Sequence, residues 1–347
     1  MRIPASEPGI SPRARVALFR VLTVLSTLLV AAGLGETGLR IFMSKQLAIP
    51  LDERNLLFHH DPRLGWFPVP NSRVRFKGSR GVLVANNSRG FRAPEQYSDS
   101  RPGIAFLGDS FVWGYDVEAS ERLTEKLQER HPEWNIFNFG VSGYGTDQEY
   151  LLLQQLFDAC KPRIVFLIFC TENDDDDNCS NVRYGGYYKP YCTVVSNRLT
   201  LHGIPVPRCE RVWLAEHEVA SESYLVRLLV RCWFKLAGPR ELRNPIPTGP
   251  IIRDMQKFVT LKGATLLVGL TKANPNLEEF LTFFKIPFLK LDTNLRYSEF
   301  GGHWTPEGHR FVCGKVEQFL IEGKFLEHPP QPQPAQESFS TNAPREK

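Results

Sequence analysis

The segment 163–169, which reads Arg-Ile-Val-Phe-Leu-Ile-Phe, constrains the fold more than any other part of this chain. A short, almost continuous apolar run is typical of a parallel strand that is covered by helices on both faces. Further apolar strand patterns lie at 104–107, 134–138, 264–270 and 287–291, and helical patterns lie at 123–130, 147–157, 276–284 and 306–321. Strands that alternate with helices predict an α/β fold built on a doubly wound parallel sheet.

The N-terminus predicts a membrane segment. Residues 1–15 are polar and carry Arg2, Arg13 and Arg15, and no charge occurs from 21 to 34. The apolar stretch 16–34 has 19 residues, close to the roughly 20 that cross a bilayer. We expect an uncleaved, single-pass anchor in the inner (plasma) membrane, with residues 16–43 as the membrane contact. A cleaved signal peptide is the alternative, because Val30-Ala-Ala is an acceptable cleavage site.

The excess of Arg before the apolar stretch predicts that the N-terminus stays in the cytoplasm and that the rest of the chain is periplasmic or extracytoplasmic. We divide the chain into a tail and anchor at 1–43, an irregular lead-in at 44–100 and a main domain at 101–328. The main domain carries an insertion at 174–250, which holds one amphipathic helix near 221–236. A Pro-, Gln- and Ser-rich tail at 329–347 is predicted to be disordered.

Composition argues against several classes of function. The net charge is +4 and no basic stripe is interleaved with aromatic residues, so a nucleic-acid partner is not expected. The seven cysteines match no zinc motif, and a disulfide among Cys179, Cys192 and Cys209 stays open. The acidic run 174–177 lacks the alternating ligands of a calcium loop and predicts a solvated loop. We therefore expect no metal and no cofactor.

Four loops are predicted to meet at the carboxyl edge of the sheet, where α/β proteins place their sites: 108–115, 139–146, 171–178 and 292–305. They supply a hydroxyl from Ser110, backbone amides made accessible by glycine, an amide side chain from Asn173 and an imidazole from His303. A serine needs a base to become nucleophilic, and the oxyanion that it generates needs preorganised donors. These residue types together indicate acyl transfer.

The same residues resemble the SGNH/GDSL hydrolase family. Gly108-Asp-Ser110 is similar to its nucleophile block, Asn138-x-Gly-x-x-Gly143 to its second block and Asn173-Asp174 to its third. The resemblance implies a flavodoxin-like sheet, Ser110 as nucleophile and His303 as base. It also implies an oxyanion hole made by the backbone N–H of Gly143 and the side chain of Asn173.

The lead-in contains Asp61-Pro-Arg-Leu-Gly-Trp66 and Asn87-Ser-Arg-Gly-Phe-Arg92, which are similar to a segment that precedes the nucleophile block in membrane-anchored bacterial members. Relatives of those members include enzymes that add or remove O-acetyl groups on envelope polysaccharides. The resemblance therefore implies a serine esterase or O-acyltransferase that acts on ester groups of an envelope carbohydrate or lipid.

One departure from the family pattern concerns the residue that orients the histidine. The family has an Asp two or three residues before it, where this chain has Gly301 and Phe300. Glu299 and Asp292 are the candidates for a substitute, and a backbone carbonyl is the other possibility. The missing acid motivates an alternative function, a non-catalytic envelope protein that keeps the fold to bind glycan or lipid.

Overall fold

The computed structural model describes residues 11–49, 56–95, 101–196 and 198–326. The chain forms two compact units, one made of residues 1–51 and 209–239 and the other of residues 52–208 and 240–347. The predicted insertion 174–250 thus contributes to both units. The predicted disordered tail at 329–347 lies outside the described residues.

The first unit is helical. Its elements are α1 (Pro12–Phe42), α7 (Glu210–Glu216), α8 (Glu218–Ser221) and α9 (Tyr224–Ala237). Ser11 caps the start of α1 by accepting a hydrogen bond from the Ala14 amide, and a proline occupies the first turn. This helix has 31 residues, a mean hydropathy of 2.0 over its most apolar window and no buried side chain, so it is long and apolar enough to cross a membrane.

The second unit is built on a five-stranded parallel sheet in the order β13-β12-β7-β5-β6. The strands are β5 (Gly103–Gly108), β6 (Asn135–Asn138), β7 (Ile164–Phe169), β12 (Thr265–Leu270) and β13 (Phe288–Lys290). Numbered along the chain, this order is 2-1-3-4-5, the flavodoxin-like arrangement. The predicted fold class is confirmed, and β7 is the fully buried central strand that its apolar run predicted.

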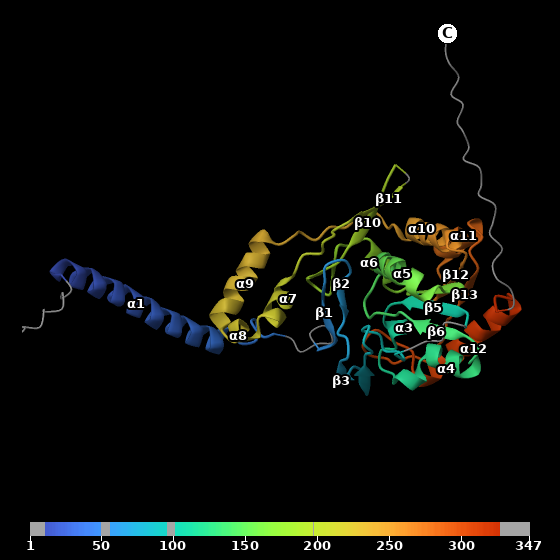
Figure 1. The fold of residues 1–347 in the computed structure, drawn as a ribbon, viewed down its shortest axis with the longest axis horizontal. Coiled ribbons are helices and arrows are strands. Elements are labelled where there is room, and N and C mark those ends of the chain that lie inside the picture. The colour runs from blue at the N-terminus through green and yellow to red at the C-terminus, as the bar shows by residue number, and fades with distance from the viewer. Residues whose placement is uncertain (1–10, 50–55, 96–100, 197, 327–347) are drawn as a thin grey trace, which may run out of the picture. The chain divides into compact units, whose positions relative to one another are not determined.

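Helices cover both faces of the sheet. They are α3 (Ser110–Trp113), α4 (Leu123–Arg130), α5 (Thr146–Cys160), α6 (Asp174–Asn178), α10 (Thr248–Leu261), α11 (Pro275–Phe283) and α12 (Pro306–Glu322), with a 3-10 turn η1 (Ala119–Glu121). In Figure 1, α4 and α12 pack together on one side of the sheet and α5 and α10 pack together on the other. The sequence pattern did not predict α10.

The lead-in and the insertion add four antiparallel hairpins to the second unit. The lead-in forms β1 (Phe58–Asp61) with β2 (Gly65–Pro68), and β3 (Arg73–Lys77) with β4 (Gly81–Ala85). The insertion forms β8 (Val182–Arg183) with β9 (Tyr187–Tyr188), and β10 (Tyr191–Val195) with β11 (Arg198–His202). Short strands were predicted for the lead-in, whereas the hairpins of the insertion were not.

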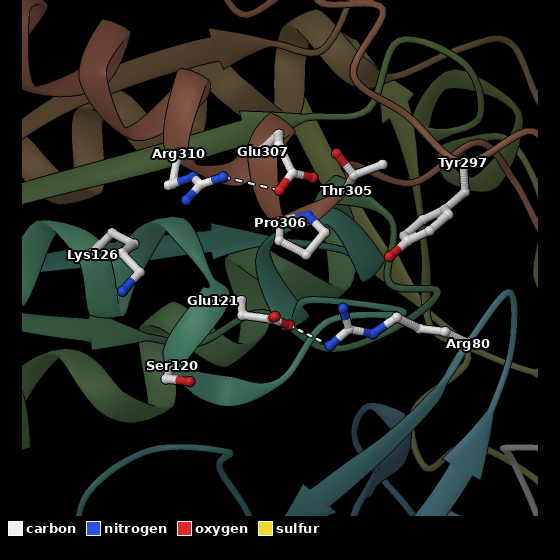
Figure 2. Close-up of a pocket in the computed structure, with 9 residues that line it drawn as sticks. All are labelled: Arg80, Ser120, Glu121, Lys126, Tyr297, Thr305, Pro306, Glu307 and Arg310. Carbon is white, nitrogen blue, oxygen red and sulfur yellow. Dashed lines mark hydrogen bonds and ion pairs between the residues drawn. The ribbon is translucent and has the colours of Figure 1, made fainter.

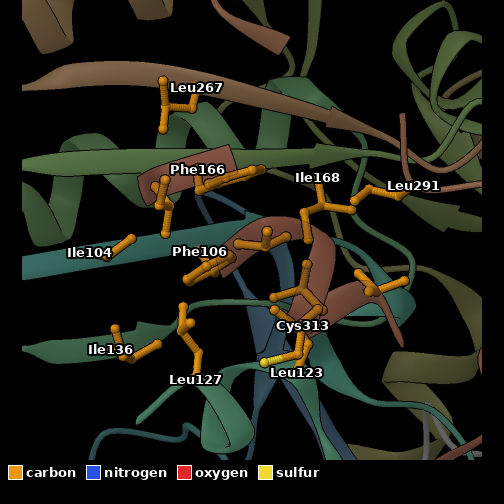
Figure 3. Packing of buried hydrophobic residues seen from close by; sticks show 14 of the residues in the cluster. Ile104, Phe106, Leu123, Leu127, Ile136, Phe166, Ile168, Leu267, Leu291 and Cys313 are labelled. Carbon is orange, nitrogen blue, oxygen red and sulfur yellow. The ribbon is translucent and has the colours of Figure 1, made fainter. Parts of the chain in front are cut away.

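One cluster of the hydrophobic core lies between the sheet and the α4–α12 layer. Figure 3 shows Phe106 and Phe166 from neighbouring strands stacked at its centre, with ring centroids 5.2 Å apart. Leu123 and Leu127 of α4 close one side, and Cys313 of α12 fills a buried position among them. Interiors packed this way deform little, so the loops at the strand ends are held on a rigid base.

Candidate active site

Ser110 lies on a tight turn between β5 and α3. Asp109 is the N-cap of α3, and its Oδ1 accepts a hydrogen bond from the Phe111 amide at 2.9 Å. Gly114 ends this single-turn helix in the left-handed conformation that glycine adopts without strain. The local sequence thus fixes the serine at the carboxyl end of a central strand, where the sheet rule placed it.

Ser110 and His303 are brought together from positions 193 residues apart. The Ser110 Oγ lies 2.7 Å from the His303 Nε2, and each residue is only 8 % exposed. Burial is the main cause that lowers the pKa of His303 to about 4, and the positive charge of Arg296 lowers it further. The imidazole is therefore neutral at pH 7, which is the state that can accept the serine proton.

Neither predicted acid orients His303 in this structure. Among the described residues no hydrogen-bond partner reaches its Nδ1, and the side chains of Glu299 and Asp292 are exposed. The intervening Phe300, Gly301 and Gly302 all have positive φ, and this turn delivers the histidine without bringing a carboxylate along. The backbone of Phe300 is the remaining alternative. Its interaction with the ring opposes the lowering of the pKa of His303, but it does not have the geometry of a hydrogen bond to Nδ1.

Two aromatic rings hold the imidazole instead. Tyr115 stacks on His303 with ring centroids 4.4 Å apart and an interplanar angle of 24°. Phe111 packs at 5.2 Å, tilted by 53°. Both rings come from the segment that follows Ser110, so the same turn positions the serine and packs against His303. A protonated imidazole would gain a cation–π contact with Tyr115.

The loop that carries Gly143 is tied to the nucleophile turn by backbone contacts. The Val141 amide donates to the Gly108 carbonyl at 3.1 Å, and the Gly140 amide donates to the Asn138 side chain at 3.1 Å. A Cβ on Gly140 would lie 2.3 Å from the Trp113 amide nitrogen, so only glycine permits this close approach. Gly143 itself has a φ of +78°, a conformation typical of glycine.

The lead-in supports this loop through Trp66. Its indole Nε1 donates to the Ser142 carbonyl at 3.1 Å, and its own carbonyl accepts from the Tyr144 hydroxyl at 2.6 Å. The Ser142 C=O and the Gly143 N–H belong to one planar trans peptide and point in opposite directions. Trp66 therefore fixes the direction of the Gly143 N–H, a donor that the family resemblance assigns to the oxyanion hole.

Asn173 follows β7 and reaches the nucleophile turn, where its Nδ2 lies 3.4 Å from the Asp109 Oδ2. The preceding residue, Glu172, pairs with Arg296 at 2.6 Å, and hydrogen bonds and this charge lower its pKa to about 2 despite burial. The Arg296 guanidinium lies 5.0 Å from the Phe111 ring centroid. The third loop and the loop that precedes His303 are thus linked by an ion pair beside the serine.

Buried acids lie behind the nucleophile turn. Asp109, Cys170 and Asp174 place one ligand atom each within 4.8 Å of the others, so these three side chains form a group of described residues that could hold a metal ion. Burial raises the pKa of all three. Protons can therefore reduce the repulsion between these groups.

Lys189 carries the positive charge that is buried deepest in this region. Its Nζ pairs with Asp147 at 2.5 Å and donates to the carbonyls of Asp177, Ser180 and Pro190. The side chains of Lys189 and Asp147 are both 0 % exposed.

The predicted solvated acidic loop at 174–177 is wrong in part, because Asp174 and Asp177 are buried within α6. Cys179, Cys192 and Cys209 are all free thiols.

A surface pocket lies apart from the serine. Figure 2 shows it beside the start of α12, lined by charged side chains that include Arg80, Glu121 and Arg310. Its volume is about 480 Å³, and neither Ser110 nor His303 lines it.

Comparisons with known proteins find similarity to several solved structures, all at low sequence identity. An esterase from a Pseudoalteromonas species shares 11 % identity over 65 % of this chain and 99 % of its own, with a TM-score of 0.38. A lipolytic G-D-S-L family member from Veillonella parvula shares 12 % identity over 62 % of this chain and 96 % of its own, with a TM-score of 0.37. A family 3 carbohydrate esterase from Clostridium thermocellum shares 14 % identity over 66 % of this chain and 100 % of its own, with a TM-score of 0.36. No model of a protein family matches the chain, and no curated protein matches it.

Sequence reasoning missed three residues of this site. Tyr115 and Arg296 belong to no motif, and only the fold brings them to His303. Trp66 lies in the lead-in segment that resembles membrane-anchored members, but nothing in the sequence connects it with Ser142.

Proposed function

We propose that this protein is a membrane-anchored serine hydrolase of ester bonds, with Ser110 as nucleophile and His303 as general base. The 2.7 Å contact between the Ser110 Oγ and the His303 Nε2 carries the proposal. A neutral imidazole at this distance is what an alcohol needs in order to lose its proton as it attacks a carbonyl.

In the proposed reaction these groups act in the following order. The Ser110 Oγ attacks the ester carbonyl while the His303 Nε2 takes the hydroxyl proton. The oxyanion is stabilised by the amides of Ser110 and Gly143 and by the side chain of Asn173, each donor being worth about 3–4 kcal/mol. His303 then protonates the leaving alcohol, and an acyl-enzyme remains on Ser110. Water, or the hydroxyl of an acceptor sugar, resolves it with His303 again acting as base.

The substrate we propose is a small acyl ester on a cell-envelope carbohydrate or lipid, and O-acetyl is the acyl group that we favour. The low exposure of the dyad supports a small acyl group, because 8 % exposure of Ser110 leaves little room around the nucleophile. The helix α1 supports the envelope location, since it is long and apolar enough to span the inner membrane. The Arg residues that precede its apolar stretch favour an extracytoplasmic domain.

A second candidate is a non-catalytic binding protein that keeps the fold. The observation in its favour is the His303 Nδ1, which has no hydrogen-bond partner among the described residues. In serine hydrolases the orienting acid holds the correct tautomer, and in one of them its loss lowers kcat about 10⁴-fold.

Turnover of p-nitrophenyl acetate by the detergent-purified full chain separates the two functions. We expect turnover by the wild type, none above background for Ser110→Ala, and an unchanged rate for Ser120→Ala, which removes an exposed hydroxyl elsewhere. Absence of turnover in a folded wild type would support the binding protein. Acetate release from O-acetylated polysaccharide then tests the substrate class.

A further inference from the structure

The helix α9 presents an apolar stripe that nothing in its own unit covers. Leu229, Trp233 and Leu236 are 60 %, 66 % and 88 % exposed. Their spacing of i, i+4 and i+7 places them on one face of the helix. Cys232, also exposed, lies three residues after Leu229 at the edge of the same stripe. Three large exposed side chains in register mark an interaction surface rather than scattered apolar residues.

The other side of α9 is committed to contacts within the unit. Arg227 donates to the Leu47 carbonyl at 3.1 Å, and Arg231 pairs with Glu210 of α7 at 2.9 Å. The Arg227 guanidinium also lies 4.4 Å from the Tyr224 ring centroid. Because these arginines are held inside the unit, the helix cannot rotate to bury its apolar stripe without breaking them.

Glu36 fixes the start of α9 to the last turns of α1. Its carboxylate accepts hydrogen bonds from the Ser223 hydroxyl at 2.8 Å and from the amides of Tyr224 and Leu225 at 3.0 and 2.9 Å. A carboxylate at a helix N-terminus satisfies free amides and complements the helix dipole. Arg40 adds an ion pair with Glu36 at 2.7 Å and a hydrogen bond to the Glu222 carbonyl at 2.8 Å.

The position of Glu36 sets the depth at which α9 begins. From Arg20 to Glu36 the helix α1 carries no charge, and 16 residues at 1.5 Å each span about 24 Å. That length is somewhat below the roughly 30 Å of a hydrocarbon core, so Arg20 and Glu36 fall near its two boundaries. Figure 1 shows α9 beside this end of α1 and running across its direction. A helix in that position lies along the bilayer surface.

We propose that α9 is an interfacial helix that rests its Leu229, Trp233 and Leu236 stripe in the headgroup boundary of the bilayer that α1 spans. The proposal rests on the membrane anchoring that is part of the proposed function. Tryptophan is enriched at this depth because its ring is apolar and its N–H is polar. Amphipathic helices with such a stripe sit roughly 5–10 Å into the headgroup and acyl boundary.

The test attaches a nitroxide spin label to Cys232 of the full chain in phosphatidylcholine vesicles. Cys160→Ser removes the other accessible thiol, and a chain that also carries Cys232→Ser measures background labelling. We expect oxygen, which dissolves in the bilayer, to relax the spin label, and a water-soluble nickel complex to have little access to it. The label should lie roughly 5–10 Å below the bilayer surface. The double variant Leu229→Glu with Leu236→Glu should return the label to water. Leu261→Glu, which alters an 88 % exposed leucine of α10, is the matched control and should leave the depth unchanged.

Each contrary outcome has its own meaning. A chain that does not float with the vesicles fails at the anchor, and with it the proposed function loses its membrane part. A chain that floats with a water-exposed label overturns the interfacial helix alone. Spin–spin broadening that grows with protein density would show that a second copy covers the stripe, which also overturns it.

Discussion

Trp66→Phe removes one hydrogen bond from the support of the Gly143 loop while keeping an aromatic ring. Trp66 is 2 % exposed, and its indole donates to the Ser142 carbonyl at 3.1 Å. Without that donor the Ser142–Gly143 peptide loses the contact that sets its direction. We expect kcat to fall and KM to change little, because the proposed role of the Gly143 N–H is to stabilise the oxyanion rather than to bind the ester.

The size of the effect has two bounds. A buried hydrogen bond contributes about 1 kcal/mol, which is about fivefold in rate. Complete loss of one oxyanion donor costs about 10²–10³ in kcat. We therefore expect kcat to fall by about 5- to 100-fold.

The assay is initial-rate hydrolysis of p-nitrophenyl acetate, with thermal unfolding measured on the same samples. A purely packing role for Trp66 would lower Tm and leave kcat unchanged, and that result would refute the reasoning. A fall in kcat in a variant that remains folded at the assay temperature would support it.

Three other perturbations have defined outcomes. Lys189→Met leaves Asp147 buried without its cation and should cost about 3–5 kcal/mol, visible as a lower midpoint in urea, and adding Asp147→Asn should recover part of the loss. Because the pKa of His303 is lowered to about 4, kcat/KM should rise through pH 4 and be level by pH 6, and a midpoint near the ordinary 6.5 would contradict the burial of the ring. The unfolded chain binds the His303 proton between pH 6.5 and 4 while the native ring stays neutral, so unfolding free energy should fall as the pH drops through that window. Gly140→Ala forces a Cβ against the Trp113 amide and should lower Tm, whereas Gly314→Ala, where nothing lies within 4 Å, should not.

The sequence could predict the sheet and the first contacts of the site because local patterns carry them. The apolar run of β7 and the turn residues Gly108 and Asp109 are readable without tertiary information. That the four loops share one edge followed from the parallel sheet, and the structure brings Ser110 to His303.

Other features depend on contacts between distant segments. The left-handed turn at 300–302 separates Glu299 from the ring, and the sequence holds no signal for that turn beyond its glycines. The side chain of Asp292 is exposed and does not reach the ring either. Burial of Asp174 depends on its hydrogen bond from the Cys170 amide and on the surrounding helices, so an acidic run that looks solvated becomes interior. The helix α10 was missed although Ile251, Met255 and Val259 recur at helical spacing in its sequence. The hairpins of the insertion were missed as well, although their strands pair with close neighbours in the sequence.

The central claim is that Ser110 is an activated nucleophile, and covalent labelling tests it most directly. The full chain in detergent is treated with a fluorophosphonate, and the modified peptide is located by mass spectrometry. We expect one adduct on Ser110, formed much more slowly in His303→Gln, and none in Ser110→Ala. A folded wild type that stays unmodified, or an adduct elsewhere with Ser110 untouched, would contradict the account.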